Sequence, residues 1–385
     1  MKKVCALVLA VVLIWAVALP AGAVDLQLAA PSAVLMDLTT GTVLYEANAH
    51  QPMAPASVTK VMTLLLIMEA IDSGKIGWQD MVTASEAAAA KGGSQVYLKV
   101  GETMSVEEMV KSIAVSSAND CACAMAEYIA GSEAGFVERM NQRAQELGME
   151  NTHFVNCTGL DDDPSAAEHL TTAYDIAVMS RELLLNHPDI KRFTTIWMDT
   201  VRNGSFGLSN TNKLVRFYEG TTGLKTGYTS SAGHCLSASA QRDGLELVAV
   251  VLHCASSADR FQSAKALLDY GFANYALVPV QDEAALPAVP VVLGAQEEVK
   301  PVISGPEQLL IAKEQKQSIT RGVTLEPSVQ APVSQGQRLG TLTVRAGDEV
   351  LAEVPLVAET AVTRLTWKDL FLDFLGRAAM AADAS

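Results

Sequence analysis

The stretch PASVTKVMT, residues 55–63, sets Ser57 and Lys60 three positions apart just as a strongly apolar segment begins. The residues that follow, to about Ser73, are apolar on nearly every side, which predicts a central, buried helix. Positions i and i+3 share one face of a helix, so the Ser57 hydroxyl and the Lys60 amine can meet. A serine hydroxyl needs a base to act as a nucleophile, and a buried, neutral lysine amine can supply one.

The bulk composition limits the class of protein. The chain has 385 residues, of which 49% are hydrophobic and 18% charged, so it can bury sizeable cores in two domains. Its formal net charge of −15 argues against a nucleic-acid partner, which would need a basic surface. The sequence holds no metal-ligand spacing such as C-x-x-C, and we predict neither a metal site nor a cofactor.

Residues 1–23 have the pattern of an export signal. Lys2 and Lys3 precede an apolar run from Val4 to Leu19, and Pro20–Ala23 then supplies the small residues of a cleavage site. The run is shorter than the roughly 20 residues that a spanning helix needs, so cleavage is favoured over an uncleaved anchor. We therefore predict that the mature protein lies outside the cytoplasm.

Five cysteines remain beyond the signal: Cys121, Cys123, Cys157, Cys235 and Cys254. Because their number is odd, at least one thiol is free or pairs between chains. Cys121 and Cys123 are two positions apart, so a helix would direct them about 200° apart and prevent their pairing. Small, buried, unreactive thiols are the favoured state for most of the five.

Residues 24–275 alternate between strand-like and helix-like patterns, which predicts one domain of mixed structure. Two β-like runs, 33–38 and 42–45, flank a Thr-Thr-Gly turn and predict a hairpin. From Gly223 to Cys254 the pattern is strand-like again, with two β runs around Arg242-Asp243-Gly244. Besides the helix at 57–73, helical patterns lie at residues 105–131, 133–147, 172–185 and 260–275.

The composition changes after Tyr275. Residues 276–360 hold prolines among short Val, Leu and Ile runs, which predicts a small all-β domain. Residues 361–385 predict an amphipathic helix, too short to cross a bilayer comfortably but suited to lying in its interface. The alternative is that its apolar stripe packs on the β domain or on a second copy of the chain. The stripe consists of Leu365, Trp367, Leu370, Phe371, Phe374, Leu375 and Ala378, and the charged face carries Lys368, Asp369, Asp373 and Arg377.

Two further motifs give the serine–lysine pair a chemical context. Ser117-Ala118-Asn119 sets a hydroxyl and an amide two positions apart, which suits a short turn that aims both into a cleft. In the predicted strand that holds Lys225-Thr226-Gly227, alternation puts Lys225 and Gly227 on one face, and glycine lets a substrate backbone approach closely. The charge of Lys225 would also favour a neutral Lys60. Each motif alone has a structural interpretation, as a helix cap or a solvated lysine, but together the three indicate a catalytic site.

The set S-x-x-K, S-x-N and K-T-G resembles the serine penicillin-binding proteins and β-lactamases. The segments PASVTKVMT, VSSANDCA, LGMENTHFVNCTGL, EHLTTAYDIAVMS and GTTGLKTGYTSSAGHCL narrow the resemblance to the low-molecular-mass D-alanyl-D-alanine carboxypeptidases, the peptidase S11 family. The resemblance implies an α+β fold. It comprises a β-lactamase/transpeptidase-like domain (24–275), with an antiparallel sheet, helices and a helical subdomain, then a small all-β domain (276–360) and a membrane-anchor helix (361–385).

The resemblance also implies a reaction, the removal of the terminal D-alanine from peptidoglycan pentapeptide stems, with β-lactam antibiotics as acylating inhibitors. Carried over by position, Ser57 is the acylated nucleophile and Lys60 its general base. Ser117 passes a proton toward the leaving group, and Asn119 orients the substrate amide. The oxyanion hole comprises the backbone N–H of Ser57 and that of a strand residue near Gly227.

For the terminal carboxylate of the substrate, the resemblance implies binding by Lys225, Thr226 and Gly227, with support from Arg260. Some members of the family carry a second arginine upstream of K-T-G. This sequence offers Thr211 there, which leaves more of the carboxylate to the lysine and to Arg260. The implied location is the outer face of the cytoplasmic membrane or the cell wall, with the C-terminal helix on the membrane surface.

Two other functions fit part of the pattern. A class A β-lactamase uses a glutamate in an E-x-x-L-N pattern, which Glu182-Leu-Leu-Leu-Asn186 matches literally. However, this pattern has few fixed letters, and a second domain is unexpected in a secreted lactamase. A non-catalytic penicillin sensor or wall-binding protein would be indicated by the loss of Ser57, Lys60 or Lys225, but all three are present. The carboxypeptidase is therefore the favoured interpretation.

Overall fold

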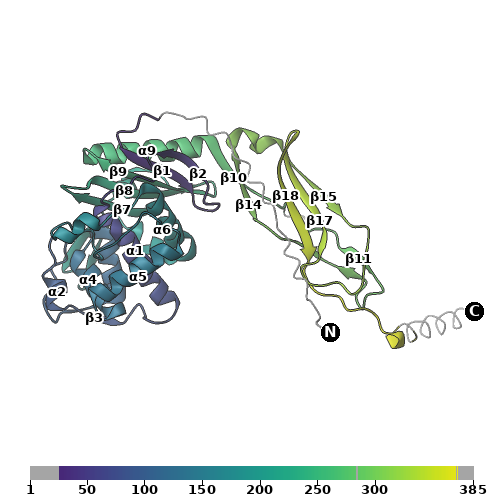
Figure 1. The fold of residues 1–385 in the computed structure, drawn as a ribbon, viewed down its shortest axis with the longest axis horizontal. Coiled ribbons are helices and arrows are strands. Elements are labelled where there is room, and N and C mark those ends of the chain that lie inside the picture. The colour runs from purple at the N-terminus through teal and green to yellow at the C-terminus, as the bar shows by residue number, and fades with distance from the viewer. Residues whose placement is uncertain (1–25, 283–284, 370, 372–385) are drawn as a thin grey trace, which may run out of the picture. The chain divides into compact units, whose positions relative to one another are not determined.

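The computed structural model describes residues 26–282, 285–369 and 371, which form two units (Figure 1). One unit comprises Asp25–Asp282 with Pro306–Gln317, and the other comprises Glu283–Gly305 with the residues from Ser318 onward. The expected export signal and most of the expected terminal helix lie outside the described residues. Within the described part of the chain, no helix is both long enough and apolar enough to cross a membrane.

The first unit is built on a five-stranded antiparallel sheet with the strand order β2-β1-β9-β8-β7. Successive side chains of a strand point to opposite faces, so each strand contributes to two cores. In β9, Val248 and Val250 enter one core, whereas Leu247 and Ala249 enter the other. β7 forms a free edge of the sheet. The strands are β1 (Ser32–Asp37), β2 (Val43–Ala47), β7 (Thr221–Thr229), β8 (Gly233–Arg242) and β9 (Leu245–Cys254).

Helices cover both faces of this sheet (Figure 1). On one face α9 (Ser257–Asn274) packs against β8 and β9, and on the other α6 (Ala173–Asn186) packs against β1 and β9. α1 (Lys60–Asp72) lies against α6, and ten of its thirteen residues are buried. It is therefore the central, buried helix that the sequence predicts.

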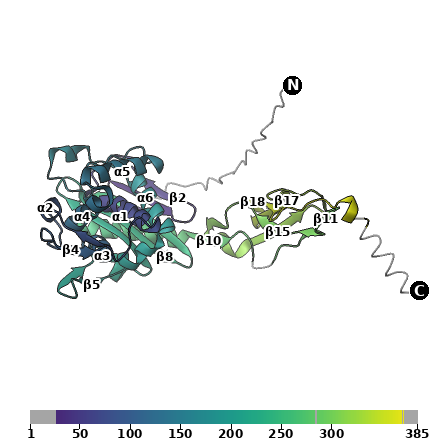
Figure 2. The ribbon, with the colours of Figure 1, turned by 90° about the horizontal axis from the view of Figure 1, so that it is seen from below.

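A helical group lies beside α1 (Figure 2). It contains α2 (Glu86–Ala89), α3 (Val106–Ser116), α4 (Asn119–Ala130) and α5 (Glu133–Glu146). The helical run expected at 105–131 is broken, because Ser117 adopts a left-handed conformation with φ +62° that ends α3. Smaller elements of this unit are β3 (Met81–Thr83), β4 (Thr103–Ser105), α7 (Lys191–Thr194), β5 (Met198–Val201), β6 (Phe206–Ser209), α8 (Leu214–Phe217), β10 (Tyr275–Pro279) and β14 (Gln308–Ala312).

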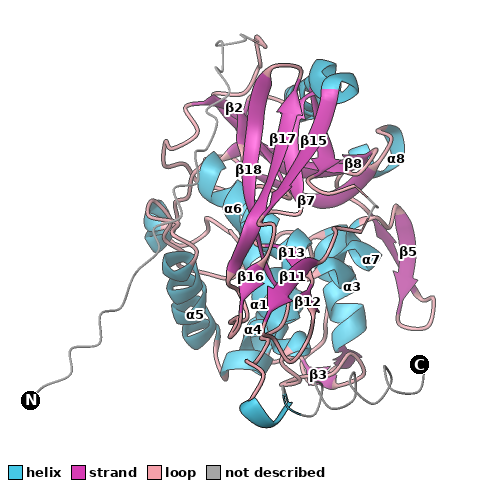
Figure 3. Cartoon of the chain, turned by 90° about the vertical axis from the view of Figure 1, so that its right-hand side faces the viewer, coloured by secondary structure: helices cyan, strands magenta, loops and turns pink. Residues whose placement is uncertain are grey.

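The second unit is all-β among its described residues apart from short helical turns, and Figure 3 shows its longest strands side by side. Its antiparallel sheet has the order β13-β18-β17-β15, and a three-stranded sheet has the order β12-β11-β16. A small core around Val289, Leu339 and Val362 holds it together. Its strands are β11 (Val289–Val292), β12 (Glu298–Val299), β13 (Pro301–Ile303), β15 (Ile319–Leu325), β16 (Val329–Gln330), β17 (Arg338–Ala346) and β18 (Glu349–Ala358).

Candidate active site

Ser57 and Lys60 meet at the start of α1. Ser57 lies in a short 3-10 turn, Ala56–Thr59, and Lys60 is the first residue of the helix. Lys60 Nζ lies 2.8 Å from Ser57 Oγ, and Lys60 is fully buried. Burial lowers the pKa of Lys60 from its ordinary value to about 7, although nearby Cys157 and Asp120 oppose the shift. A substantial share of the amine is therefore neutral near neutral pH and able to accept the serine proton.

A backbone carbonyl that sequence reasoning did not single out holds Lys60 from the other side. Lys60 Nζ donates to the carbonyl of Thr158 at 2.7 Å, and Thr63 Oγ1 donates to that of Cys157 at 2.6 Å. Asn156 Oδ1 accepts from the backbone nitrogens of Thr158 and Gly159 and so shapes the turn. The Asn-Cys-Thr-Gly sequence suggests a turn, but an acceptor carbonyl leaves no mark in a sequence.

Ser117 and Asn119 both present unsatisfied oxygen atoms. The side chains are 4% and 2% exposed, and neither Ser117 Oγ nor Asn119 Oδ1 has a hydrogen-bond partner. The other end of the Asn119 amide is held, because its Nδ2 donates to the carbonyl of Gly92 at 2.8 Å. Buried polar atoms are nearly always paired, and these two oxygens are left free to accept hydrogen bonds from a substrate.

The strand β7 carries Lys225, Thr226 and Gly227. Lys225 Nζ donates to the carbonyl of Thr226 at 2.8 Å, and Thr226 Oγ1 donates to Thr211 Oγ1 at 2.7 Å. A Cβ atom on Gly227 would lie 2.6 Å from the carbonyl oxygen of Pro55 and 3.1 Å from the backbone nitrogen of Ser57. Only glycine lets β7 pass this close to the nucleophile, so the structure brings the S-x-x-K and K-T-G motifs together.

Lys60, Lys225 and Arg260 are three basic groups close enough to affect one another's charge. Burial, then repulsion from the other two cations, holds the pKa of Lys225 well below its usual range. Burial is the main cause of the lowered pKa of Lys60, and the contribution expected from Lys225 is not among its causes. None of the three forms a salt bridge with a carboxylate of the described residues. The free carboxylate of a peptide substrate would supply the missing negative charge.

Arg260 reaches β7 from α9, and its shortest hydrogen bond is to a backbone carbonyl of that strand. It is 8% exposed, and its Nη1 donates to the carbonyls of Gly227 at 2.9 Å and Cys235 at 3.4 Å. Nη2 lies 3.4 Å from Ser257 Oγ, and Nε has no partner. The guanidinium is thus directed at the K-T-G strand.

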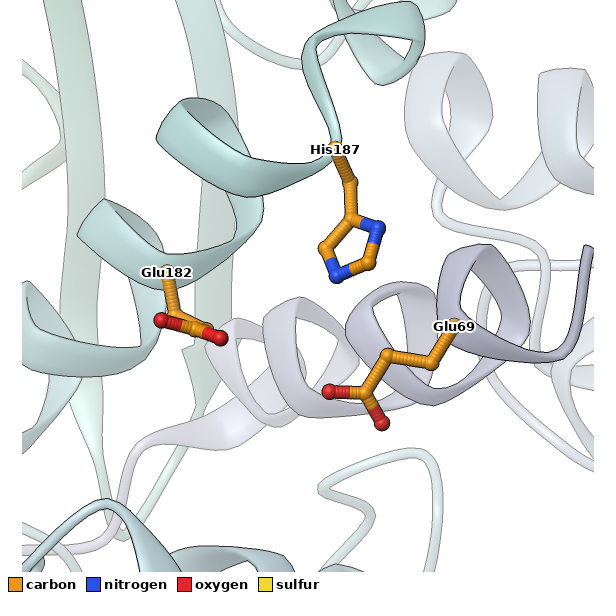
Figure 4. A group of neighbouring side chains, drawn as sticks. All are labelled: Glu69, Glu182 and His187. Carbon is orange, nitrogen blue, oxygen red and sulfur yellow. The ribbon is translucent and has the colours of Figure 1, made fainter. Parts of the chain in front are cut away.

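The glutamate of the E-x-x-L-N match lies far from the nucleophile. Glu182 faces Glu69 of α1, with His187 nearby (Figure 4). Glu69 is nine residues along α1 from Lys60, roughly 13 Å at 1.5 Å per residue. Arg143 binds both carboxylates, with Nε 2.7 Å from Glu69 Oε1 and Nη2 2.7 Å from Glu182 Oε1. This cluster is an ion-pair network between helices, and it is too remote to activate water at Ser57.

The five cysteines expected in the mature chain are all free and buried. Burial raises the pKa of Cys235 to about 11 and that of Cys254 to about 12, which keeps both as thiols. They fit the expected description of small, buried, unreactive residues.

Comparisons with known proteins agree with this geometry. The family described as D-alanyl-D-alanine carboxypeptidase matches residues 19–256, and the family of the penicillin-binding protein 5 C-terminal domain matches residues 278–364. The chain is 42% identical over 353 residues to the D-alanyl-D-alanine carboxypeptidase DacF of Bacillus subtilis (strain 168), covering 90% of this chain and 88% of that relative.

Solved structures agree as well. Penicillin-binding protein 5 of Haemophilus influenzae is similar with a TM-score of 0.74 and 29% identity, covering 88% of this chain and 98% of that one. Penicillin-binding protein D2 of Listeria monocytogenes, in its ampicillin-bound form, is similar with a TM-score of 0.56 and 31% identity, covering 64% and 98%. The chain therefore belongs to the peptidase S11 family of D-alanyl-D-alanine carboxypeptidases, which are hydrolases.

Proposed function

We propose that this enzyme removes the terminal D-alanine of peptidoglycan stem pentapeptides through an acyl-enzyme on Ser57. The observation that carries the proposal is the 2.8 Å contact between Ser57 Oγ and the buried amine of Lys60, whose pKa is lowered to about 7. Lys60 takes the proton of the Ser57 hydroxyl as its oxygen attacks the carbonyl of the penultimate D-alanine. Water then hydrolyses the resulting ester.

The remaining motif residues bind the substrate and move the proton. Ser117 relays the proton to the leaving D-alanine amine, and Asn119 holds the substrate amide, which fits the unpaired oxygens of both side chains. Lys225 and Thr226 bind the terminal carboxylate, while Gly227 keeps the strand close enough for the substrate to lie along it. Arg260 supports this strand from behind.

β-Lactam antibiotics acylate the same serine in this proposal, because their strained amide is attacked in the place of the peptide. Support comes from the ampicillin-bound structure of the similar Listeria protein. The proposed location is the outer face of the cytoplasmic membrane or the cell wall, where the substrate lies. The apolar pattern of residues 4–19 and the terminal stripe from Leu365 onward favour export and attachment to the membrane surface.

The test is direct. Purified enzyme is incubated with a pentapeptide ending in D-Ala-D-Ala, and release of one equivalent of D-alanine is measured beside Ser57→Ala. Labelled penicillin, followed by digestion, should mark only the peptide that contains Ser57. Label on another serine, or D-alanine release by Ser57→Ala, would overturn the proposal.

A further inference from the structure

The peptide between Gly227 and Tyr228 is oriented by Arg260. Arg260 Nη1 donates to the Gly227 carbonyl at 2.9 Å and to the Cys235 carbonyl at 3.4 Å. Gly227 and Cys235 are register partners on β7 and β8. The Gly227 carbonyl therefore points inward, toward β8 and the arginine.

The N–H of Tyr228 must point the other way. The cis peptides of the described residues lie elsewhere, so this one is trans, and its C=O and N–H groups are antiparallel. β7 is a free edge of the sheet, so the Tyr228 N–H is directed out of it. On that strand a Cβ of Gly227 would be 3.1 Å from the Ser57 nitrogen, which places the nucleophile's own N–H beside the same peptide.

The charge of Arg260 has no carboxylate partner among the described residues, although its guanidinium also lies 4.8 Å from the centre of the Phe261 ring and 3.4 Å from Ser257 Oγ. The side chain is 8% exposed, and no described carboxylate forms a salt bridge with it. A cation bound to a carbonyl draws electron density through the amide and makes its N–H a stronger donor, and the effect is larger where water is excluded.

We propose that Arg260 is a positioning residue that orients and polarises the Gly227–Tyr228 peptide, whose N–H is the strand donor that the family resemblance implies beside the Ser57 N–H in the oxyanion hole. The inference rests on the proposed acyl-enzyme at Ser57. It gives Arg260 a role different from contact with the substrate carboxylate, because its Nη1 is engaged on the inner side of the strand. Arg260 thus stabilises the negative oxygen of the tetrahedral intermediate indirectly, through the peptide unit that joins Gly227 to Tyr228.

The test measures the strength of the hydrogen bonds that the oxyanion hole donates to the ester carbonyl. Full-length enzyme is acylated with penicillin carrying a ¹³C-labelled β-lactam carbonyl, and the ester C=O stretch of the acyl-enzyme is measured by difference infrared spectroscopy. Arg260→Gln should move the stretch to higher wavenumber and slow acylation by about 10- to 100-fold, less than the full loss of one oxyanion donor. The slowing should be similar for a peptide substrate with a free C-terminal carboxylate and for the same peptide amidated.

Arg181→Gln is the matched control, since Arg181 also donates to two backbone carbonyls, those of Leu38 and Thr39, but away from the motifs. It should leave the stretch unchanged. If Arg260→Gln does not fold, Arg260→Lys, which keeps a cation, should give a smaller shift in the same direction. An unshifted stretch, or a loss confined to the carboxylate-bearing peptide, would overturn the inference. A wild-type enzyme that forms no ester at all would instead refute the acyl-enzyme on Ser57.

Discussion

Gly159 lies directly against the carbonyl oxygen of Ala56: a Cβ atom on Gly159 would be 1.9 Å from it. That oxygen also accepts from Thr59 Oγ1 at 2.8 Å, and Ala56 itself has φ +48°. The residue before the nucleophile is thus fixed by the same loop whose Thr158 carbonyl holds Lys60. The geometry of the nucleophile and that of its base depend on one glycine.

Gly159→Ala should therefore impair catalysis as well as folding. The methyl group must displace the Ala56 backbone, so we expect penicillin acylation to fall by at least about tenfold, as misplacement of catalytic groups by about an ångström does. The matched control is Gly148→Ala: both glycines have positive φ, +79° and +71°, but a Cβ on Gly148 meets nothing within 4 Å. The control should lose only about 1–2 kcal/mol in the free energy of unfolding, with acylation unchanged. Equal acylation rates in the two variants would contradict this reading.

The pH dependence of acylation should report Lys60. The neutral amine is the base, and the pKa of Lys60 is lowered to about 7, so the rate should rise as the pH increases through about 7 and then level off. Lys60→Arg stays protonated and should lose at least about 100-fold in acylation, measured by stopped-flow with penicillin. Lys75→Arg, at an exposed lysine beyond the end of α1, serves as the control. A rate that is flat from pH 5 to 9, or an active Lys60→Arg enzyme, would rule out the general-base role.

Much of this site could be predicted from the sequence, because its side chains belong to motifs with recognisable residue types at fixed spacing. Ser57 and Lys60 do meet, and β7 does carry Lys225. Backbone groups are the same at every residue, so a sequence cannot show which of them take part in a site. The roles of the Thr158 carbonyl and of the Gly227–Tyr228 peptide are therefore visible only in the structure.

The sequence predicted some elements of the fold correctly and missed one turn between strands. The hairpin expected at 33–38 and 42–45 is present as β1 and β2. The strand-like pattern from Gly223 to Cys254 predicted two β runs, whereas the structure has three strands, because Ser230–Ala232 makes a turn between β7 and β8. Its Thr-Ser-Ser-Ala-Gly sequence has no strong breaker before the glycine, so the pattern runs through it.

Lys225 should matter for substrates with a free terminal carboxylate. A lysine attracts that group by charge, and no described carboxylate neutralises Lys225 in the folded protein. Amidating the C-terminus of the peptide should cost the parent enzyme most of its kcat/KM and cost Lys225→Ala little more. Lys213→Ala, at an exposed lysine, should behave like the parent. If amidation costs Lys225→Ala as much as it costs the parent, the carboxylate is bound elsewhere.

Glu182→Gln separates the carboxypeptidase from a class A β-lactamase. Glu182 accepts from Arg143 at 2.7 Å and from Asn186 Nδ2 at 2.9 Å, so it ties helices together. The variant should lose about 1 kcal/mol in the free energy of unfolding, typical of a partly exposed ion pair, and should hydrolyse its penicilloyl-enzyme at the parental rate. A penicilloyl-enzyme that persists much longer in Glu182→Gln than in the parent, as measured by mass spectrometry, would favour the lactamase mechanism instead.

Attachment to the membrane should depend on the apolar stripe of the helix that the sequence predicts for residues 361–385. Two of its described residues, Trp367 and Phe371, are 88% and 59% exposed, so they do not pack on the β unit. The truncation should begin after Thr366, because the backbone nitrogen of Leu365 donates to the carbonyl of Leu293. Without residues 367–385 the enzyme should stay active and no longer sediment with vesicles of zwitterionic lipid.

Trp367→Ser should weaken binding to the vesicles, whereas Lys368→Ser, at the charged neighbour, should change it little, since apolar burial rather than charge drives binding. For the same reason added salt should have a weak effect. If the truncated enzyme still sediments, or if the full-length enzyme forms dimers and never sediments, the stripe is not a membrane anchor.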